Sequence, residues 1–339
     1  MHRNNFDFLR ILFAVLVIIS HSYDLSTPEN QTTSILHPVI NTISLSYWGV
    51  RGFFVISGYL VLQSLIRSNS VISFLWKRIV RIFPGLILIL ICTLLLLPFF
   101  YTSPIPYWKN SEVLSYFPSN LSLFKLQYSI EGIFENNPYP KIINGSLWTL
   151  RYEFFFYLLL SPLFFLKMNI KLVRIILIFS YILSYILYFY FSSSNSSYLN
   201  IKLHFTDLSL FFLAGCIFAT FNVSVTINSK LYILLITLII LISFISKEIV
   251  DYLKYVYYPV LIILFANMYM KPLEYIPLKF GDLSYGIYLS AFLIQQSILS
   301  TFSISPINLM FATIFISSIY GFLSWNFIEK RALSFKYLF

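Results

Sequence analysis

The chain has 339 residues, of which 58% are hydrophobic and only 11% charged. Soluble domains carry about 25% charged residues, so this composition excludes a soluble protein and predicts an all-α polytopic membrane protein. The net charge of +10 does not indicate a nucleic-acid-binding protein, because the basic residues recur in short clusters between apolar runs, as in cytoplasmic loops of membrane proteins.

Apolar runs long enough to cross a bilayer recur along the whole chain. A helix that crosses the ~30 Å hydrocarbon core needs about 20 mostly apolar residues. Ten runs approach that length, near residues 6–24, 47–66, 81–101, 146–166, 171–191, 203–221, 230–247, 253–270, 281–299 and 307–328. We therefore predict one transmembrane domain over residues 1–339 with no fused soluble domain. No spacing of residues indicates a metal site.

The distribution of basic residues predicts the orientation of these spans. With the N-terminus inside, fourteen lysines and arginines lie in cytoplasmic segments and six in outer segments. Because cytoplasmic loops carry an excess of Lys and Arg, both termini are predicted to be cytoplasmic. The long connection over residues 102–145 is then extracytoplasmic. Loops of that length have a binding or lid role, or they are disordered.

Two ionisable residues stand within the first span, FDFLRILFAVLVIISHS. Arg10 and His21 return to nearly the same helix face and lie about 16 Å apart. Such groups are costly in hydrocarbon and are functional candidates. A neutral imidazole can take a proton from a hydroxyl and pass it to a leaving group, and Asp24 at i+3 can orient the ring. Two alternatives stay open: His21 as a core histidine, and Arg10 neutralised by Asp7.

The second and third spans contain further candidates. In GVRGFFVISGYL, small residues such as Gly58 favour close helix packing, and Ser57 can instead contribute a hydroxyl to a donor channel. In WKRIVRIFPG, Arg78 and Arg81 share a helix face at i,i+3 near the predicted cytoplasmic end. A guanidinium suits phosphate recognition, although a cluster that only follows the positive-inside rule has the same pattern.

The fourth span, in NGSLWTLRYEFFFYLLL, contains a carboxylate. Asn144 or Ser146 can cap this helix, which places Glu153 about two turns inside its start. A carboxylate at that depth must be paired, hydrated or protonated. A structural ion pair with Arg51 or Arg151 and a direct catalytic role both stay open.

The ninth span begins with GDLSYGIYLSAF at residues 281–292. Its small residues and tyrosines give it the same character as the second span. Asp282 is a candidate helix cap, and Tyr285 and Tyr288 are candidate residues for lining a pocket.

Together these segments resemble the acyltransferase 3 family of integral membrane O-acyltransferases. Five motifs in order, between Phe6 and Arg331, carry the resemblance. They are the Arg10–x10–His21 pattern, GVRGFFVISGYL, KRIVRIFP, SLWTLRYEFFFY, and LSYGIYL with WNFIEKRA. The chain departs from many relatives at one point, because Ser290 and Ala291 follow Tyr288–Leu289 where those relatives carry a Trp-His pair.

The resemblance implies roles for the candidate residues. Members of the family transfer acetyl or related groups from cytoplasmic acyl-CoA to extracytoplasmic hydroxyls, usually on bacterial glycans. By resemblance, His21 is the essential base and Glu153 completes the site. Arg10, Arg78 and Arg81 are implied to bind the donor.

We therefore predict an O-acetyltransferase of the bacterial inner membrane. It uses acetyl-CoA as a donor substrate and binds no permanent cofactor; its other partners are membrane lipid and a lipid-linked or surface glycan, such as an O-antigen or capsule repeat. The alternative is a polysaccharide flippase or polymerase, which shares the membrane and cationic character. Transporters often carry inverted repeats with interrupted helices, and none is visible here. A sensor or structural membrane protein is a third class, and it would not bind acyl-CoA.

Overall fold

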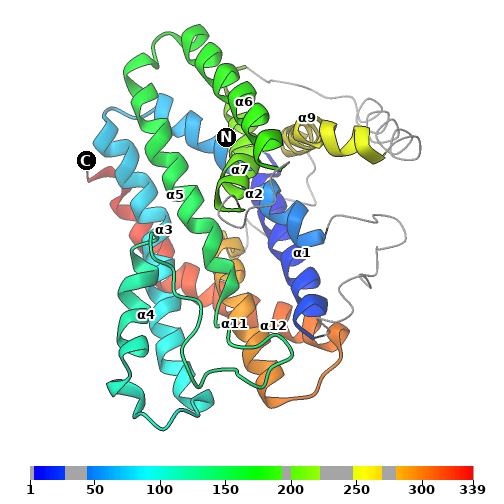
Figure 1. Cartoon of the computed structure of the whole chain (residues 1–339). Coiled ribbons are helices and arrows are strands. Elements are labelled where there is room, and N and C mark those ends of the chain that lie inside the picture. Colours follow the sequence, from blue (N-terminus) through cyan, green and yellow to red (C-terminus); the bar gives the residue numbers. More distant parts are fainter. Residues whose placement is uncertain (1–3, 27–43, 193–199, 222–246, 269–279, 339) are drawn as a thin grey trace. The chain divides into compact units, whose positions relative to one another are not determined.

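The computed structural model describes residues 4–26, 44–192, 200–221, 247–268 and 280–338 (Figure 1). Within these ranges the regular elements are helices, apart from one isolated antiparallel bridge between Tyr101 and Ile133. The prediction of an all-α protein is therefore confirmed for this part of the chain.

The longer helices overlap the predicted apolar runs, with starts that differ from those of the runs by up to ten residues. They are α1 (Phe6–Ser26), α2 (Leu45–Ile66), α3 (Val71–Leu96), α5 (Trp148–Leu160), α6 (Ile170–Ser192), α7 (Asn200–Ala219), α9 (Lys247–Asn267), α11 (Ser284–Thr301) and α12 (Pro306–Ser324). The shorter elements are η2 (Leu97–Phe100), η3 (Tyr107–Lys109), α4 (Ser111–Leu121), η4 (Gly145–Leu147), η5 (Ser161–Leu166), η7 (Trp325–Glu329), α13 (Lys330–Ser334) and η8 (Phe335–Tyr337).

Seven helical segments of the described residues are long and apolar enough to cross a membrane. They are Phe6–Ser26, Leu45–Ile66, Val71–Phe100, Gly145–Leu166, Ile170–Ser192, Ile201–Ala219 and Pro306–Ser334. The run predicted at 230–247 lies almost wholly outside the described residues, and the run at 253–270 matches a shorter apolar helix, Tyr252–Asn267. The run at 281–299 matches α11, whose glutamines and serines make it less apolar. The total of ten spans stays a prediction.

The chain forms two compact units, and each is assembled from segments that are distant in sequence. The first contains Met1–Arg10, Arg51–Leu75 and Phe155–Ile276, and the second contains Ile11–Val50, Trp76–Phe154 and Pro277–Phe339. Four of the five boundaries fall inside α1, α2, α3 and α5, and the fifth lies outside the described residues, so neither unit is a consecutive stretch. One domain over residues 1–339 stays a prediction.

In the first unit, α2 and α7 approach each other at two glycines. A Cβ atom on Gly58 would lie 1.9 Å from the carbonyl oxygen of Phe212, and one on Gly215 would lie 2.1 Å from that of Val55. A side chain at either position would therefore force the helices apart. The packing role predicted for the small residues of GVRGFFVISGYL is confirmed at Gly58.

A buried ion pair joins three helices of the same unit. Arg51 on α2 donates through Nε (2.9 Å) and Nη2 to one carboxylate oxygen of Asp207 on α7. The hydroxyl of Tyr255 on α9 donates to the other oxygen at 3.0 Å. All three residues are buried. The sequence left Arg51 as a possible partner for Glu153; the structure gives it Asp207.

In the second unit, α11 is a buried helix. The buried residues on it are Ser284, Gly286, Ile287, Tyr288, Leu289, Ser290, Ala291, Phe292, Leu293, Gln295 and Gln296. It packs against α12, where the backbones approach at Gly286 and Gly321. A helix buried on all sides, and carrying glutamines and serines, must satisfy these polar groups with protein partners.

The segment over residues 102–145 is folded. It contains η3 and α4, and buried apolar side chains form its core: Val113, Tyr116, Leu123, Ile130, Ile133 and Phe134. The Asn110 side chain caps α4 by accepting from Glu112 N, and the Glu112 carboxylate accepts from Glu131 N at 2.7 Å. Burial raises the pKa of Tyr107 to about 12. The disordered alternative for this segment is therefore wrong, and a binding or lid role stays a prediction.

Candidate active site

The first candidate residues lie near the C-terminal end of α1. His21 Nδ1 is 3.6 Å from Asp24 Oδ2, and their side chains are 27% and 40% exposed. This distance exceeds that of a normal hydrogen bond. A long separation does not argue against a catalytic pair, because catalytic hydrogen bonds are often long before substrate binds. The i+3 spacing predicted from the sequence places the carboxylate beside the ring.

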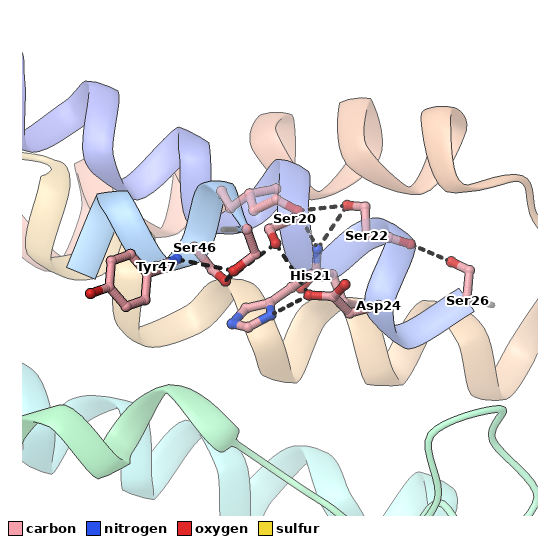
Figure 2. A network of polar contacts seen from close by, with 10 residues as sticks. Ser20, His21, Ser22, Asp24, Ser26, Ser46 and Tyr47 are labelled. Atoms are coloured by element: carbon pink, nitrogen blue, oxygen red, sulfur yellow. Dashed lines mark hydrogen bonds and ion pairs between the residues drawn. The ribbon is translucent and has the colours of Figure 1, made fainter. Parts of the chain in front are cut away.

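Serine hydroxyls hold the Asp24 side of this pair (Figure 2). The Ser20 hydroxyl donates to Asp24 Oδ2 at 3.2 Å, and it lies 3.2 Å from the hydroxyl of Ser46 on α2. Ser46 in turn contacts the Ser44 hydroxyl at 2.9 Å. The carboxylate is therefore oriented by a chain of hydroxyls that joins the start of α2 to α1.

A buried glutamine contacts α1 at the turn that carries His21. Gln295 Nε2 donates to the Ile18 carbonyl at 3.0 Å and to the Ser22 hydroxyl at 2.8 Å. The Ser22 hydroxyl itself donates to the Ile18 carbonyl at 2.8 Å. Gln295 and Ser22 are fully buried. This turn of α1 is thus bonded directly to α11.

An aromatic ring of α11 contacts the imidazole. The rings of His21 and Phe292 meet edge to face, with centroids 5.6 Å apart and planes at 79°. The Phe292 ring also packs directly against Gly145. A Cβ atom at this position would lie 2.7 Å from the ring, so a larger residue there would displace it. Phe292 thus connects His21 to the residues that precede α5.

The start of α5 is bonded to the same helix. Asn144 caps η4 by accepting from Ser146 N, as the sequence allowed, and its Nδ2 donates to the Leu289 carbonyl at 2.8 Å. The hydroxyls of Thr149 and Tyr288 are 2.9 Å apart. Glu153 follows one turn later on α5 and is half-buried. The residues around His21 and those that lead to Glu153 therefore share α11 as a support.

A second cluster of charged residues is centred on Arg81 of α3. Its guanidinium pairs with Asp282 and lies 4.0 Å from the Glu329 carboxylate. The Ser324 hydroxyl donates to Glu329 Oε1 at 2.6 Å, and the Arg81 guanidinium lies 5.8 Å from the centre of the Tyr285 ring. Glu329 ends the π-helical turn η7. A π-helical turn is rare and often marks a functional site.

The other residues predicted to bind the donor are Arg10, Ser57 and Arg78, and each has its own neighbours. Arg10 pairs with Asp7 at 3.0 Å, which is the neutralising alternative from the sequence. The Ser57 hydroxyl is 3.1 Å from that of Tyr157. Arg78 lies one turn before Arg81 on α3 and is half-buried. Arg10 and His21 both lie on the unbroken helix α1, as predicted.

Sequence reasoning missed three residues that support these groups. It treated Asp282 as a cap, whereas Asp282 pairs with Arg81, and no side-chain bond caps α11. It gave Glu329 and Gln295 no role. The available signals were a carboxylate inside the last span, in WNFIEKRA, and two adjacent glutamines inside the ninth, in LIQQS. Polar residues at such positions need partners, and their identity depends on the tertiary fold.

Comparisons with known proteins agree with this description. A family described as an acyltransferase domain matches residues 3–326. An O-acetyl transferase from Shigella phage Sf6 is 29% identical over 341 residues, covering 98% of this chain and 97% of that protein. Nodulation protein 10 from Rhizobium leguminosarum bv. viciae is 36% identical over 173 residues, covering 48% of this chain and 44% of that protein. No solved structure matches the chain.

Proposed function

The chain belongs to the acyltransferase 3 family of membrane enzymes, and from this premise we propose that it moves an acetyl group from cytoplasmic acetyl-CoA to a hydroxyl of an extracytoplasmic glycan. An O-acetyl transferase among its relatives supports the choice of acetyl group and oxygen acceptor. Family membership favours this function over the flippase or polymerase alternative.

The observation that carries the proposal is the pair of His21 and Asp24. A partly exposed imidazole lies 3.6 Å from a carboxylate, near the end of a largely apolar helix. A core histidine would be enclosed and fully bonded, because buried polar groups need partners. An accessible ring with an orienting carboxylate has the arrangement of a general base.

The proposed reaction uses His21 for both proton transfers. His21 takes the proton of the acceptor hydroxyl while the hydroxyl oxygen forms a bond with the acetyl carbonyl carbon. The carbon–sulfur bond then breaks, and the imidazolium returns the proton to the sulfur of CoA. Asp24 stabilises the charged ring between these steps. In an alternative route, the acetyl group is first transferred to His21 and then to the acceptor hydroxyl. That route forms an acetyl-histidine, which rapid quenching would trap.

Arg78 and Arg81 are the proposed contacts of the donor's phosphates, and Arg10 on α1 is a further proposed donor-binding residue. Arg81 already has two carboxylate neighbours. A phosphate must therefore approach its remaining N–H groups, since a guanidinium offers five donors in a fixed fork. Glu153 completes the site from α5, and Ser57 contributes a hydroxyl to the donor channel.

The finer assignments belong to the same proposal. The apolar runs support ten spans, and the charge distribution supports cytoplasmic termini. A cytoplasmic acyl-CoA donor, as proposed here, would fit a bacterial inner membrane. The acceptor is a lipid-linked or surface glycan such as an O-antigen or a capsule repeat. Comparing glycan NMR spectra from cells with and without the protein would identify the acetylated hydroxyl.

The test is transfer of labelled acetyl groups in membrane vesicles. Vesicles that contain the full chain, given labelled acetyl-CoA, should incorporate label into glycan. The His21→Ala variant should lower kcat by about 10³-fold or more, since general-base catalysis contributes about 10²–10⁴-fold. Ser26→Ala on the same helix is the matched control, because among the described residues that hydroxyl bonds only the carbonyl of Ser22. Undiminished transfer by His21→Ala would remove this residue from the mechanism.

A further inference from the structure

Two adjacent glutamines on α11 have different partners. Gln296 Nε2 donates to the carbonyls of Tyr139 and Ile142 at 2.8 and 2.7 Å, and its Oε1 accepts from Asn137 at 3.0 Å. Every polar atom of this side chain is thus used to hold the segment over residues 102–145. Gln295 instead contacts the turn of α1 that carries His21.

Gln295 is not explained by stability alone. Its side chain is fully buried, and its Oε1 atom has no hydrogen-bond partner among the described residues. An unsatisfied buried acceptor is costly, and an apolar side chain of similar volume would avoid that cost. The bonds that Gln295 does make both go to one turn of one helix, at Ile18 and Ser22.

We infer that Gln295 is a positioning residue for His21. It acts through the Ile18 carbonyl and the Ser22 hydroxyl, which lie three positions before and one position after the histidine. Phe292, one turn earlier on the same face of α11, contacts the imidazole ring itself. The backbone turn and the ring of His21 are thus held by a single buried helix.

The same helix holds the start of α5. Leu289 accepts from Asn144, Tyr288 bonds Thr149, and Phe292 occupies the space that Gly145 leaves open. A shift of α1 relative to α11 would therefore move His21 away from the residues leading to Glu153. Small displacements of a reacting group cost large factors in rate. This inference rests on the proposed function for its catalytic consequence, but the placement of His21 can be measured independently.

The first measurement is the reactivity of His21 toward diethyl pyrocarbonate, read by mass spectrometry of the full chain in membranes. Gln295→Met keeps the volume and removes both bonds, and it should change the modification rate of His21 by threefold or more. Gln296→Met is the matched control, since it removes three bonds from the same helix, one more than Gln295→Met, at equal burial. It should lower the thermal unfolding midpoint without changing this rate. Equal rates in the two variants would overturn the inference.

The second measurement is the kinetics of acetyl transfer. Gln295→Met should lower kcat by about 10- to 100-fold with the KM for acetyl-CoA within twofold, as expected when only the positioning of the base changes. Ser290→Ala should keep the kcat of the unchanged protein, because within the described part of the chain this hydroxyl bonds only carbonyls of its own helix. Ser22→Ala should lower kcat severalfold alone and have no further effect with Gln295→Met, because both changes break one interaction. Additive effects, or an unchanged kcat in Gln295→Met, would contradict the inference.

These outcomes separate the inference from the proposed function. If the unchanged protein transfers no acetyl group, the proposed function fails, while the reactivity of His21 still tests its placement by Gln295. If transfer occurs and Gln295→Met changes neither kcat nor reactivity, only the inference fails.

Discussion

The Arg51–Asp207 pair and the His21–Asp24 pair both place charge-bearing side chains in apolar helices, yet their surroundings are opposite. The side chains of Arg51 and Asp207 are 9% and 5% exposed, and the carboxylate accepts three hydrogen bonds. His21 and Asp24 are 27% and 40% exposed, with a separation of 3.6 Å.

This difference separates a structural ion pair from a candidate active site. Arg51 and Asp207 are bonded across α2 and α7, and Tyr255 closes the group from α9, so a substrate would have to displace existing bonds. The His21–Asp24 pair keeps access and a loose geometry. Access and incomplete bonding are therefore what distinguish His21, as a candidate base, from Arg51 and Asp207, although all three are ionisable groups within predicted spans.

The largest predicted effect tests whether the Arg51–Asp207 pair is structural. Arg51→Leu leaves the carboxylate of Asp207 buried without its guanidinium, and loss of one member of a buried pair costs about 3–5 kcal/mol. The free energy of unfolding in detergent should fall by that amount. Arg51→Leu combined with Asp207→Leu should recover most of it, because no charge is then left unpaired.

Acetyl transfer by that double variant tests more sharply whether Arg51 and Asp207 take part in the reaction. Acetyl transfer per folded molecule should stay within about threefold of the unchanged protein, since a structural pair affects the amount of folded enzyme and not its chemistry. A loss of kcat at full folding would show that Arg51 and Asp207 belong to the reaction.

The next effect concerns the candidate base. Asp24→Asn keeps the size of the side chain and removes the charge that stabilises the imidazolium. We expect kcat to fall by about 10- to 100-fold, or about 1.4–2.7 kcal/mol in activation free energy. The KM for acetyl-CoA and the unfolding midpoint should change little, because Asp24 is partly exposed. Ser115→Ala, on α4, is a suitable control for an exposed polar change. A destabilised Asp24→Asn with normal kcat would make this pair structural.

Local features of both regions could be predicted from the sequence. The 3.6-residue period placed Arg10 and His21 on one helix and Asp24 beside the ring, and the Asn144 cap followed from its position before the helix. These relations involve residues within a few turns of each other, so helix geometry determines them.

The partners across the fold could not be predicted in this way. Arg51 and Asp207 are 156 positions apart, and Gln295 and Ser22 are 273 positions apart. Their pairing depends on which helices pack together, which hydropathy does not specify. Hydropathy also gave α11 as a span like the others. Its burial on all faces follows from packing against α12 and from the polar groups it bonds.

The smallest predicted effect concerns Arg10, whose ion pair with Asp7 lies between the two extremes. The pair is 3.0 Å long, but its side chains are 21% and 51% exposed. An exposed pair of this spacing contributes about 0–1 kcal/mol, so Asp7→Asn should barely change the free energy of unfolding.

If Arg10 binds a donor phosphate, Arg10→Ala should raise the KM for acetyl-CoA severalfold with kcat nearly unchanged, because uniform binding is lost. Asp7→Asn should leave that KM the same or lower it, since a competing carboxylate is removed. An unchanged KM in Arg10→Ala would assign Arg10 to the same structural class as Arg51 and leave phosphate binding to α3.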